Sequence, residues 1–373
     1  MRLRGVNLDD DAAIDTAQAA DLLRLGFNFV RMRMTFKPDT ISKGRFLPAT
    51  IDHSRLSGLT LDYENAIDDW IRILSAHHIW ILMEMRADDV LTSDEPAFYD
   101  TSQTGPLADG GATYFNYRKT WAYLANKYKN TDYIAGFGLL AEPSVSKTMP
   151  RNASPYVADD LTRFQLGLMA AITANDQRTP FFVGPDWNYA SMQYRFDEYF
   201  TAFADAGYQG RLVYEVNFLR PKPWIDDGTG PDGGLQLYGS YPAPTSFDDL
   251  VTPFPGESYR TDGGDTEIIL RDRTDVSPWF EWSMTPQFMS WYLTPALAFR
   301  ARHHVPMVVD QFGASTRSPG QLQFERDLLT LFEQQGLSYS RWGYNTRPPD
   351  RALLGNADAG AFYYDWLHSH TGP

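Results

Sequence analysis

Short apolar runs alternate with helical patterns along the whole chain, and this alternation limits the fold more than any other feature. Several runs are continuously apolar, which is typical of strands buried on both faces of a parallel sheet. Between them lie amphipathic segments, such as the stripe of Ile67, Trp70, Ile71 and Leu74 at helical spacing. The eight predicted strands are Leu3–Leu8, Phe27–Met34, Ile79–Met85, Ile134–Leu140, Pro180–Gly184, Leu212–Phe218, Pro306–Gln311 and Leu337–Trp342.

Eight strands that alternate with helices predict an α/β protein with a single (β/α)8 TIM barrel. A doubly wound sheet is the alternative, because short apolar runs are easily miscounted. No repeat, low-complexity linker or charge block interrupts the chain, so we expect one domain over residues 1–373. Long connections follow the second, third and sixth strands, and loops in these positions surround the ligand site at the top of a barrel. They are Thr35–Leu61, Asp88–Thr113 and Arg220 to about Ser283.

Charge and composition exclude several kinds of partner. The 47 acidic residues exceed the 33 Lys and Arg, and the net charge of −14 disfavours nucleic acid and anionic membrane surfaces. No apolar stretch approaches the ~20 residues of a membrane span. The absence of Cys excludes disulfides and thiolate chemistry. No protein partner is implied. No signal peptide is visible, and a mature secreted or periplasmic chain would look the same, so the compartment is left open.

Neither a metal nor a nucleotide cofactor is expected. The seven histidines fall below the third and seventh strands, in a loop or near the C-terminus, and none follows a strand: His77, His78, His303, His304, His53, His368 and His370. A Ser-His-Asp triad or a His-rich metal site on the top face is therefore not predicted. Gly136 and Gly138 mimic a dinucleotide fingerprint, but they lie within or before an apolar run rather than at a strand-to-helix turn.

A carboxylate at the tip of the fourth strand is the leading candidate for chemistry. Pro143 cannot continue the strand, so Glu142 falls at its end and faces the top of the barrel. Burial would raise the pKa of Glu142 toward the range of a general acid. The alternative is a structural salt bridge, for which Arg31 at the end of Phe27–Arg31 is the natural charge partner.

Taken together, these motifs resemble glycoside hydrolase family 5, the cellulase-like retaining glycosidases on (β/α)8 barrels, over nearly the whole chain. The resemblance implies a hydrolase that acts on an oligo- or polysaccharide with β linkages. It implies that Glu142 is the acid/base and that Gln311 occupies the nucleophile position. The matching segments are Arg4–Asn7, Leu25–Arg31, Ile134–Pro143, Leu212–Pro221, Val305–Gly313 and Trp342.

Five positions depart from the family pattern. Arg86 and Asn217 stand where His is expected, Ala141 where Asn is, Leu219 where Tyr is, and Gln311 where the nucleophilic Glu is. Losing a covalent nucleophile costs roughly 4–8 kcal/mol of transition-state stabilisation. We therefore expect a chain that is inactive or strongly impaired in the retaining mechanism. The four other departures imply natural divergence, whereas the origin of Gln311 itself is left open.

The resemblance also implies substrate contacts: Arg31, Arg86 and Asn217 would orient sugar hydroxyls or catalytic groups, and Trp342, Trp187 and Trp224 would stack on sugar rings. Strand periodicity adds expectations for the buried acids. Glu84 is expected to pair with Arg86, and Glu215 to lie one layer below Asn217. Asp310 is expected to point away from Gln311, toward the helices.

Three functions remain open. The first is a divergent glycoside hydrolase, and the second is a carbohydrate-binding protein that has lost turnover. The third is an inverting or other reaction in which Glu142 acts as acid and a loop carboxylate activates water. The loop carboxylates are Asp88, Asp89, Asp186, Asp226 and Asp227.

Overall fold

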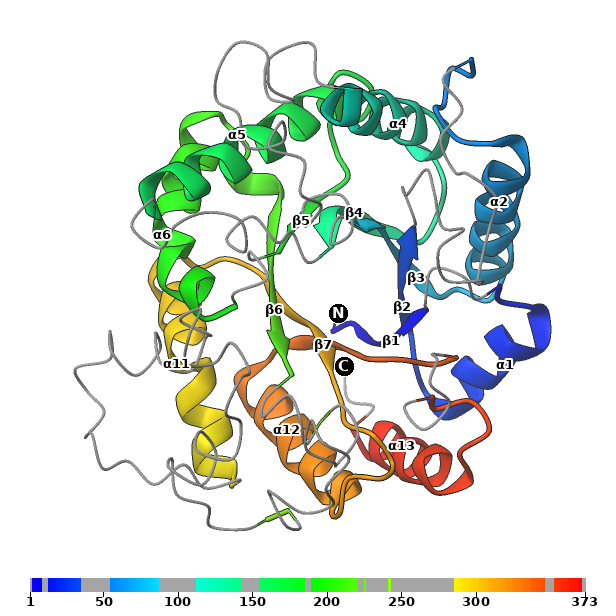
Figure 1. Cartoon of the computed structure of the whole chain (residues 1–373). Coiled ribbons are helices and arrows are strands. Elements are labelled where there is room, and N and C mark those ends of the chain that lie inside the picture. The colour runs from blue at the N-terminus through cyan, green and yellow to red at the C-terminus, as the bar shows by residue number, and fades with distance from the viewer. Residues whose placement is uncertain are drawn as a thin grey trace, which may run out of the picture.

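The computed structural model describes residues 2–8, 13–34, 54–86, 112–141, 154–184, 189–219, 225, 241–242, 285–345 and 352–370. Within them, parallel strands β1 to β8 close into a barrel in sequence order, and helices surround it (Figure 1). The predicted (β/α)8 barrel is confirmed. The doubly wound sheet is wrong, because β1 pairs with β8 and leaves no open edge. The single domain over residues 1–373 stays a prediction.

All eight predicted strands are confirmed, and each begins and ends within two residues of its predicted bounds. The continuous apolar runs identified them because most strand residues are buried. The strands are β1 (Arg4–Leu8), β2 (Phe29–Met34), β3 (Trp80–Arg86), β4 (Ile134–Ala141), β5 (Phe181–Val183), β6 (Leu212–Phe218), β7 (Met307–Phe312) and β8 (Ser338–Arg341).

The helices pack their apolar stripes against the outside of the barrel. In α2 the predicted stripe from Ile67 to Leu74 is buried. The helices are α1 (Thr16–Leu25), α2 (Leu61–Ala76), α4 (Ala112–Tyr128), α5 (Ser154–Thr173), α6 (Tyr189–Asp205), α11 (Pro286–His303), α12 (Gln321–Gln335) and α13 (Ala357–Ser369), with a 3-10 turn η5 (Gln209–Arg211) before β6. No helix among the described residues is long and apolar enough to span a membrane.

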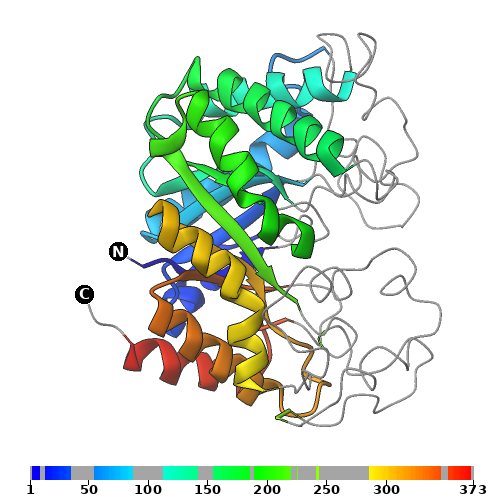
Figure 2. The same cartoon turned by 90° about the vertical axis from the view of Figure 1, so that its left-hand side faces the viewer.

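The paired histidines lie at the bottom of the barrel, as predicted. His77 caps the C-terminus of α2, and its Nδ1 lies 2.8 Å from the carbonyl oxygen of Ile73. His304 caps α11 in the left-handed conformation. The start of β1 and the end of α13 lie at this same end of the molecule (Figure 2). The C-terminal ends of the strands, where barrel enzymes bind ligands, are at the opposite end.

Glycines on the inner face of β4 make room for large side chains inside the barrel. A Cβ on Gly136 would lie 2.3 Å from the ring of Phe182, and one on Gly138 would lie 2.5 Å from Cγ of Glu84. Phe182 belongs to a small apolar cluster contributed by four strands: Phe29, Leu82, Phe182 and Val308. Both glycines lie within β4, so rejecting the dinucleotide fingerprint is confirmed.

A buried ion pair joins the last two strands to the helices that cover them. Nε of Arg341 in β8 lies 3.0 Å from Oε2 of Glu325 in α12, and both side chains are fully buried. The same carboxylate accepts hydrogen bonds from the backbone N–H of Ala314, from Gln321 and from Tyr363 of α13. Glu325 therefore fixes the backbone just after β7, beside the candidate site.

Glu325→Ala would leave Arg341 buried without its counter-ion. We expect the substitution to lower the free energy of unfolding by about 3–5 kcal/mol, measured by urea denaturation. Asp69→Ala is the matched control, because it removes the exposed partner of Arg72 and should cost at most about 1 kcal/mol. If both variants lower the free energy of unfolding by the same amount, the role assigned to Glu325 is contradicted.

Candidate functional site

The guanidinium of Arg31 is the centre of a charged cluster inside the barrel. Its Nη2 lies 2.5 Å from Oε2 of Glu84 in β3 and 3.0 Å from Oδ2 of Asp310 in β7, and Arg31 is 1% exposed. Burial alone lowers the pKa of Arg31, but the charges of Glu84 and Asp310 raise it above its usual value. Arg31 is therefore a buried cation with two carboxylate counter-ions.

Glu215 from β6 adds a third acid to this cluster. Oxygens of Glu84, Glu215 and Asp310 lie within 4.8 Å of one another. Burial raises the pKa of Glu215 well above its usual value, and the charges of Glu84 and Asp310 raise it further, against the lowering effect of Arg31. Glu215 therefore holds its proton to higher pH than an ordinary glutamic acid does.

Three carboxylates this close can hold a divalent cation. Here the guanidinium of Arg31 already contacts two of the three, Glu84 and Asp310. A metal ion in the same space would be repelled by Arg31 at short range. The residues therefore fit an ion-pair cluster with a shared proton better than they fit a metal site.

A β-bulge in β7 lies beside this cluster. Val216 of β6 pairs with Val309, but the next residue, Asn217, pairs with Gln311, so β7 has one residue more than β6 at this point. The prediction that Asp310 points toward the helices is wrong, because its carboxylate contacts Arg31 inside the barrel. Asp310 keeps the two-residue alternation from Val308, which lies in the interior cluster, and the bulge turns Gln311 to the same face.

The same bulge determines where Gln311 lies. Residues in register on parallel strands share a face, so Gln311 faces the interior with Asn217. The next residue, Phe312, packs on the helix side against Phe332 and Tyr339. Two consecutive side chains of β7, an acid and an amide, thus face the inside of the barrel. Glu215 lies two residues before Asn217 on the same face, which confirms its predicted deeper layer.

Polar side chains that sequence reasoning missed secure this end of the barrel. Asn7 of β1 donates from Nδ2 to the carbonyl oxygen of Asp310 at 3.1 Å, and its Oδ1 accepts from Ser340 at 2.6 Å. Arg33 lies in register with Glu84, on the same face of β2 as Arg31, and is almost fully buried. A signal was present for Asn7 and Arg33, which are polar residues in the largely apolar strands β1 and β2, but not for Ser340, because β8 is itself mostly polar.

The structure brings together part of the predicted site. Gln311 and Asn217 are buried and adjacent, and the backbone N–H of Trp342 donates to the carbonyl oxygen of Phe312 at 2.8 Å. Trp342 is partly buried against the core. Several residues with predicted roles lie outside the described residues: Glu142, Trp187, Trp224 and the loop carboxylates. Most of the long connections and the side chain of Arg86, at the end of β3, are also outside the described part. Those roles stay predictions.

The partners of the predicted ion pairs are partly different from those expected. Glu84 is bound to Arg31, whereas we expected it to pair with Arg86. Arg31, named as the partner of Glu142 in the alternative salt-bridge interpretation, has Glu84 and Asp310 as counter-ions. The predicted role of Arg31 in orienting sugar hydroxyls or catalytic groups stays a prediction.

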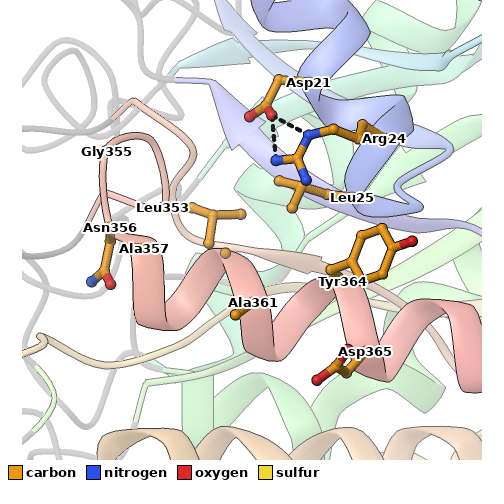
Figure 3. Close-up of a pocket in the computed structure, with 11 residues that line it drawn as sticks. Asp21, Arg24, Leu25, Leu353, Gly355, Asn356, Ala357, Ala361, Tyr364 and Asp365 are labelled. Carbon is orange, nitrogen blue, oxygen red and sulfur yellow. Dashed lines mark hydrogen bonds and ion pairs between the residues drawn. The ribbon is translucent and has the colours of Figure 1, made fainter.

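A hollow of about 600 Å³ lies on the outer surface between α1 and α13 (Figure 3). Two of its charged residues, Asp21 and Arg24, pair with each other at 2.6 Å. Tyr364 lines it from α13, with its ring stacked on His368. None of the predicted site residues that the structure describes lines this hollow, so it is separate from the candidate site in the barrel.

The raised pKa of Glu215 has a consequence for stability. The folded chain keeps a proton that the unfolded chain releases, so the stability associated with Glu215 falls as pH rises above its unfolded pKa. Glu215→Gln cannot ionise. We expect its Tm to be close to that of the parent chain at pH 4 and about 2–5 °C higher at pH 8, measured by calorimetry.

Glu64→Gln on α2 is the control with the opposite trend. Burial alone raises the pKa of Glu64, but hydrogen bonds from Lys127 and Tyr123 lower it to about 2. The stability that Glu64 contributes is present above its unfolded pKa, so this variant should lose more Tm at pH 8 than at pH 4. A Glu215→Gln variant that loses the same Tm at both pH values would contradict the retained proton.

Comparisons with known proteins show which solved structures have a similar fold. No protein-family model matches the chain, and no curated protein matches it in sequence. Among solved structures, a family 5 xyloglucan-specific endo-β-1,4-glucanase from a metagenomic library, crystallised with cellotriose, has a TM-score of 0.64 at 12% identity, covering 97% of this chain and 96% of its own. A family 5 lichenase from Caldicellulosiruptor sp. F32 has a TM-score of 0.63 at 12% identity, covering 98% and 92%.

A cellulose synthase subunit Z from Clostridioides difficile is similar over 98% of this chain and 99% of its own, with a TM-score of 0.59 at 13% identity. Identities this low establish the fold and leave the chemistry to the residues of the site. The resemblance to glycoside hydrolase family 5 indicated by the strand motifs is therefore confirmed in the architecture: the chain has the barrel of these glycosidases over almost its entire length.

Proposed function

We propose that this chain is a glycoside hydrolase-like protein that binds a β-linked glycan at the top of its barrel and is inactive or strongly impaired in retaining hydrolysis. One observation carries the proposal: on β7, Gln311 faces the interior in register with Asn217, while the neighbouring carboxylate of Asp310 is bound to Arg31. The position that would attack the sugar is therefore an amide.

The carboxylates of the buried cluster are poor substitutes for the missing nucleophile. A covalent nucleophile must be ionised and must reach the anomeric carbon from the face opposite the leaving group. The pKa of Glu215, in the deeper layer, is raised by burial and by the charges of Glu84 and Asp310, so its carboxyl group is harder to ionise than usual. Asp310 and Glu84 are ion-paired to Arg31, and attack by either would break a buried ion pair.

The substrate class follows from the architecture and the aromatic residues. The similar structures include a xyloglucan-specific endo-β-1,4-glucanase in complex with cellotriose and a lichenase. We infer a β-glucan oligo- or polysaccharide as the ligand, with Trp342 as a stacking face. The further contacts proposed from the sequence are Glu142 as acid/base and Arg86, Asn217, Trp187 and Trp224 as substrate-binding residues.

Two alternative functions remain, and hydrolysis of the glycan distinguishes them. A carbohydrate-binding protein would release no product, whereas an inverting hydrolase that uses a loop carboxylate would. An inverting reaction needs a base about 6.5–9.5 Å from the acid, and Gln311 cannot be that base. The buried amide favours binding over turnover, because it preserves the shape of the nucleophile position while removing its charge.

We expect the chain to bind cello-oligosaccharides by calorimetry and to release no product from them by chromatography. Trp342→Ala should weaken binding about tenfold, because a stacking face is lost. Trp80→Ala is the matched control: Trp80 begins β3 at the bottom of the barrel, so its loss should leave affinity unchanged.

Product release by the unmodified chain would contradict the proposed loss of activity and direct attention to the loop carboxylates. Absence of binding to every β-glucan and acidic β-glycan tried would contradict the proposed ligand class.

A further inference from the structure

The bulge in β7 places an acid and an amide side by side where a regular strand would turn one of them outward. Asp310 contacts Arg31, and Gln311 follows it at the next Cα, about 3.8 Å along the chain. Val308 belongs to the interior cluster, so regular alternation keeps Asp310 inside and would have sent position 311 to the helices. The bulge therefore brings the side chain at position 311 inside as well, directly beside the carboxylate of Asp310.

The carboxylate of Asp310 is a counter-ion of Arg31. Oxygens of Glu84, Glu215 and Asp310 lie within 4.8 Å of one another, and the charges of Glu84 and Asp310 already raise the pKa of Glu215. A fourth carboxylate at position 311 would join a region whose acids exceed its paired cation. Like charges this close cannot all ionise without a large electrostatic cost.

We propose that Asp310 is a positioning residue that acts as the β7 counter-ion of Arg31, and that the neutral side chain of Gln311 is matched to it. The amide at position 311 then keeps the number of negative charges around Arg31 low, and is more than the loss of a nucleophilic carboxylate. It follows that Gln311→Glu alone creates an overcharged site, and that the new carboxylate is accepted only when the carboxylate of Asp310 is removed as well.

Arg341 and Arg33 are further cations that the structure describes around this part of the barrel. On the helix side, Arg341 of β8 is bound to Glu325 of α12. On the inner side, Arg33 lies two residues beyond Arg31 on the same face of β2, in register with Glu84. Asn7 of β1, which binds the backbone of Asp310, and Ser340 of β8, which binds Asn7, carry no charge.

A double-mutant cycle tests this coupling without any substrate. The four proteins are the parent chain, Asp310→Asn, Gln311→Glu and the double variant, each melted at pH 5 and pH 8. We expect Gln311→Glu to lower the Tm by about 4 °C or more at pH 8 and by less at pH 5, where the new acid can stay protonated. When Asp310→Asn is also present, the loss that Gln311→Glu causes at pH 8 should fall by half or more.

Gln165→Glu controls for the general cost of placing a carboxylate inside the protein. Gln165 is a buried glutamine on α5, away from the cluster. The loss of Tm that this control causes should be the same with and without Asp310→Asn. If Gln311→Glu also loses the same Tm in both backgrounds, or loses it independently of pH, the coupling is absent and the proposal is overturned.

An activity readout extends the test and rests on the proposed function. On cello-oligosaccharides at pH 6, we expect the double variant to hydrolyse at least tenfold faster than Gln311→Glu alone, because the new carboxylate at position 311 ionises only when the neighbouring acid has been removed. A single variant as active as the double one would overturn the proposal. If the Tm coupling is present but no variant releases product, the inference about Asp310 stands, and the descent from a retaining hydrolase is contradicted instead.

Discussion

A guanidinium buried inside a closed barrel is the constraint on which the rest of this site depends. An unpaired charge in a protein interior is very costly, so Arg31 requires counter-ions wherever the chain can supply them. The chain supplies Glu84 from β3 and Asp310 from β7, and Glu215 joins them as a neighbour whose pKa is raised. Strands far apart in the sequence are thereby tied together at one level of the barrel.

Local backbone features make space for this cluster. Gly138 allows Glu84 to lie across β4, and Gly184 leaves room for Glu215, whose Oε2 would lie 3.2 Å from a Cβ at that position. The bulge in β7 turns Gln311 inward beside Asp310 and sets it in register with Asn217. The glycines and the bulge therefore serve an electrostatic purpose as well as a steric one.

The strands could be predicted because continuous apolar runs report burial on both faces, and closure of the barrel followed from their number and order. That Asp310 and Gln311 share a face could not be predicted, because a bulge leaves no mark in the hydrophobic pattern and breaks the alternation by one residue. The partner of Glu84 was missed for a related reason. Spacing along β3 pointed to Arg86, whereas closure of the barrel brings Arg31 from the neighbouring strand within ion-pair distance.

In its architecture the protein is a (β/α)8 barrel similar to those of family 5 endoglucanases, and β7 carries the amide of Gln311 next to Asp310, a counter-ion of Arg31. The most direct test is a neutron diffraction structure at pH 7, which locates hydrogen positions in the cluster. The account predicts a fully protonated Arg31 between Glu84 and Asp310 and one deuteron held by Glu215 toward Glu84. Three ionised carboxylates around a bound metal ion, with Arg31 displaced, would contradict it.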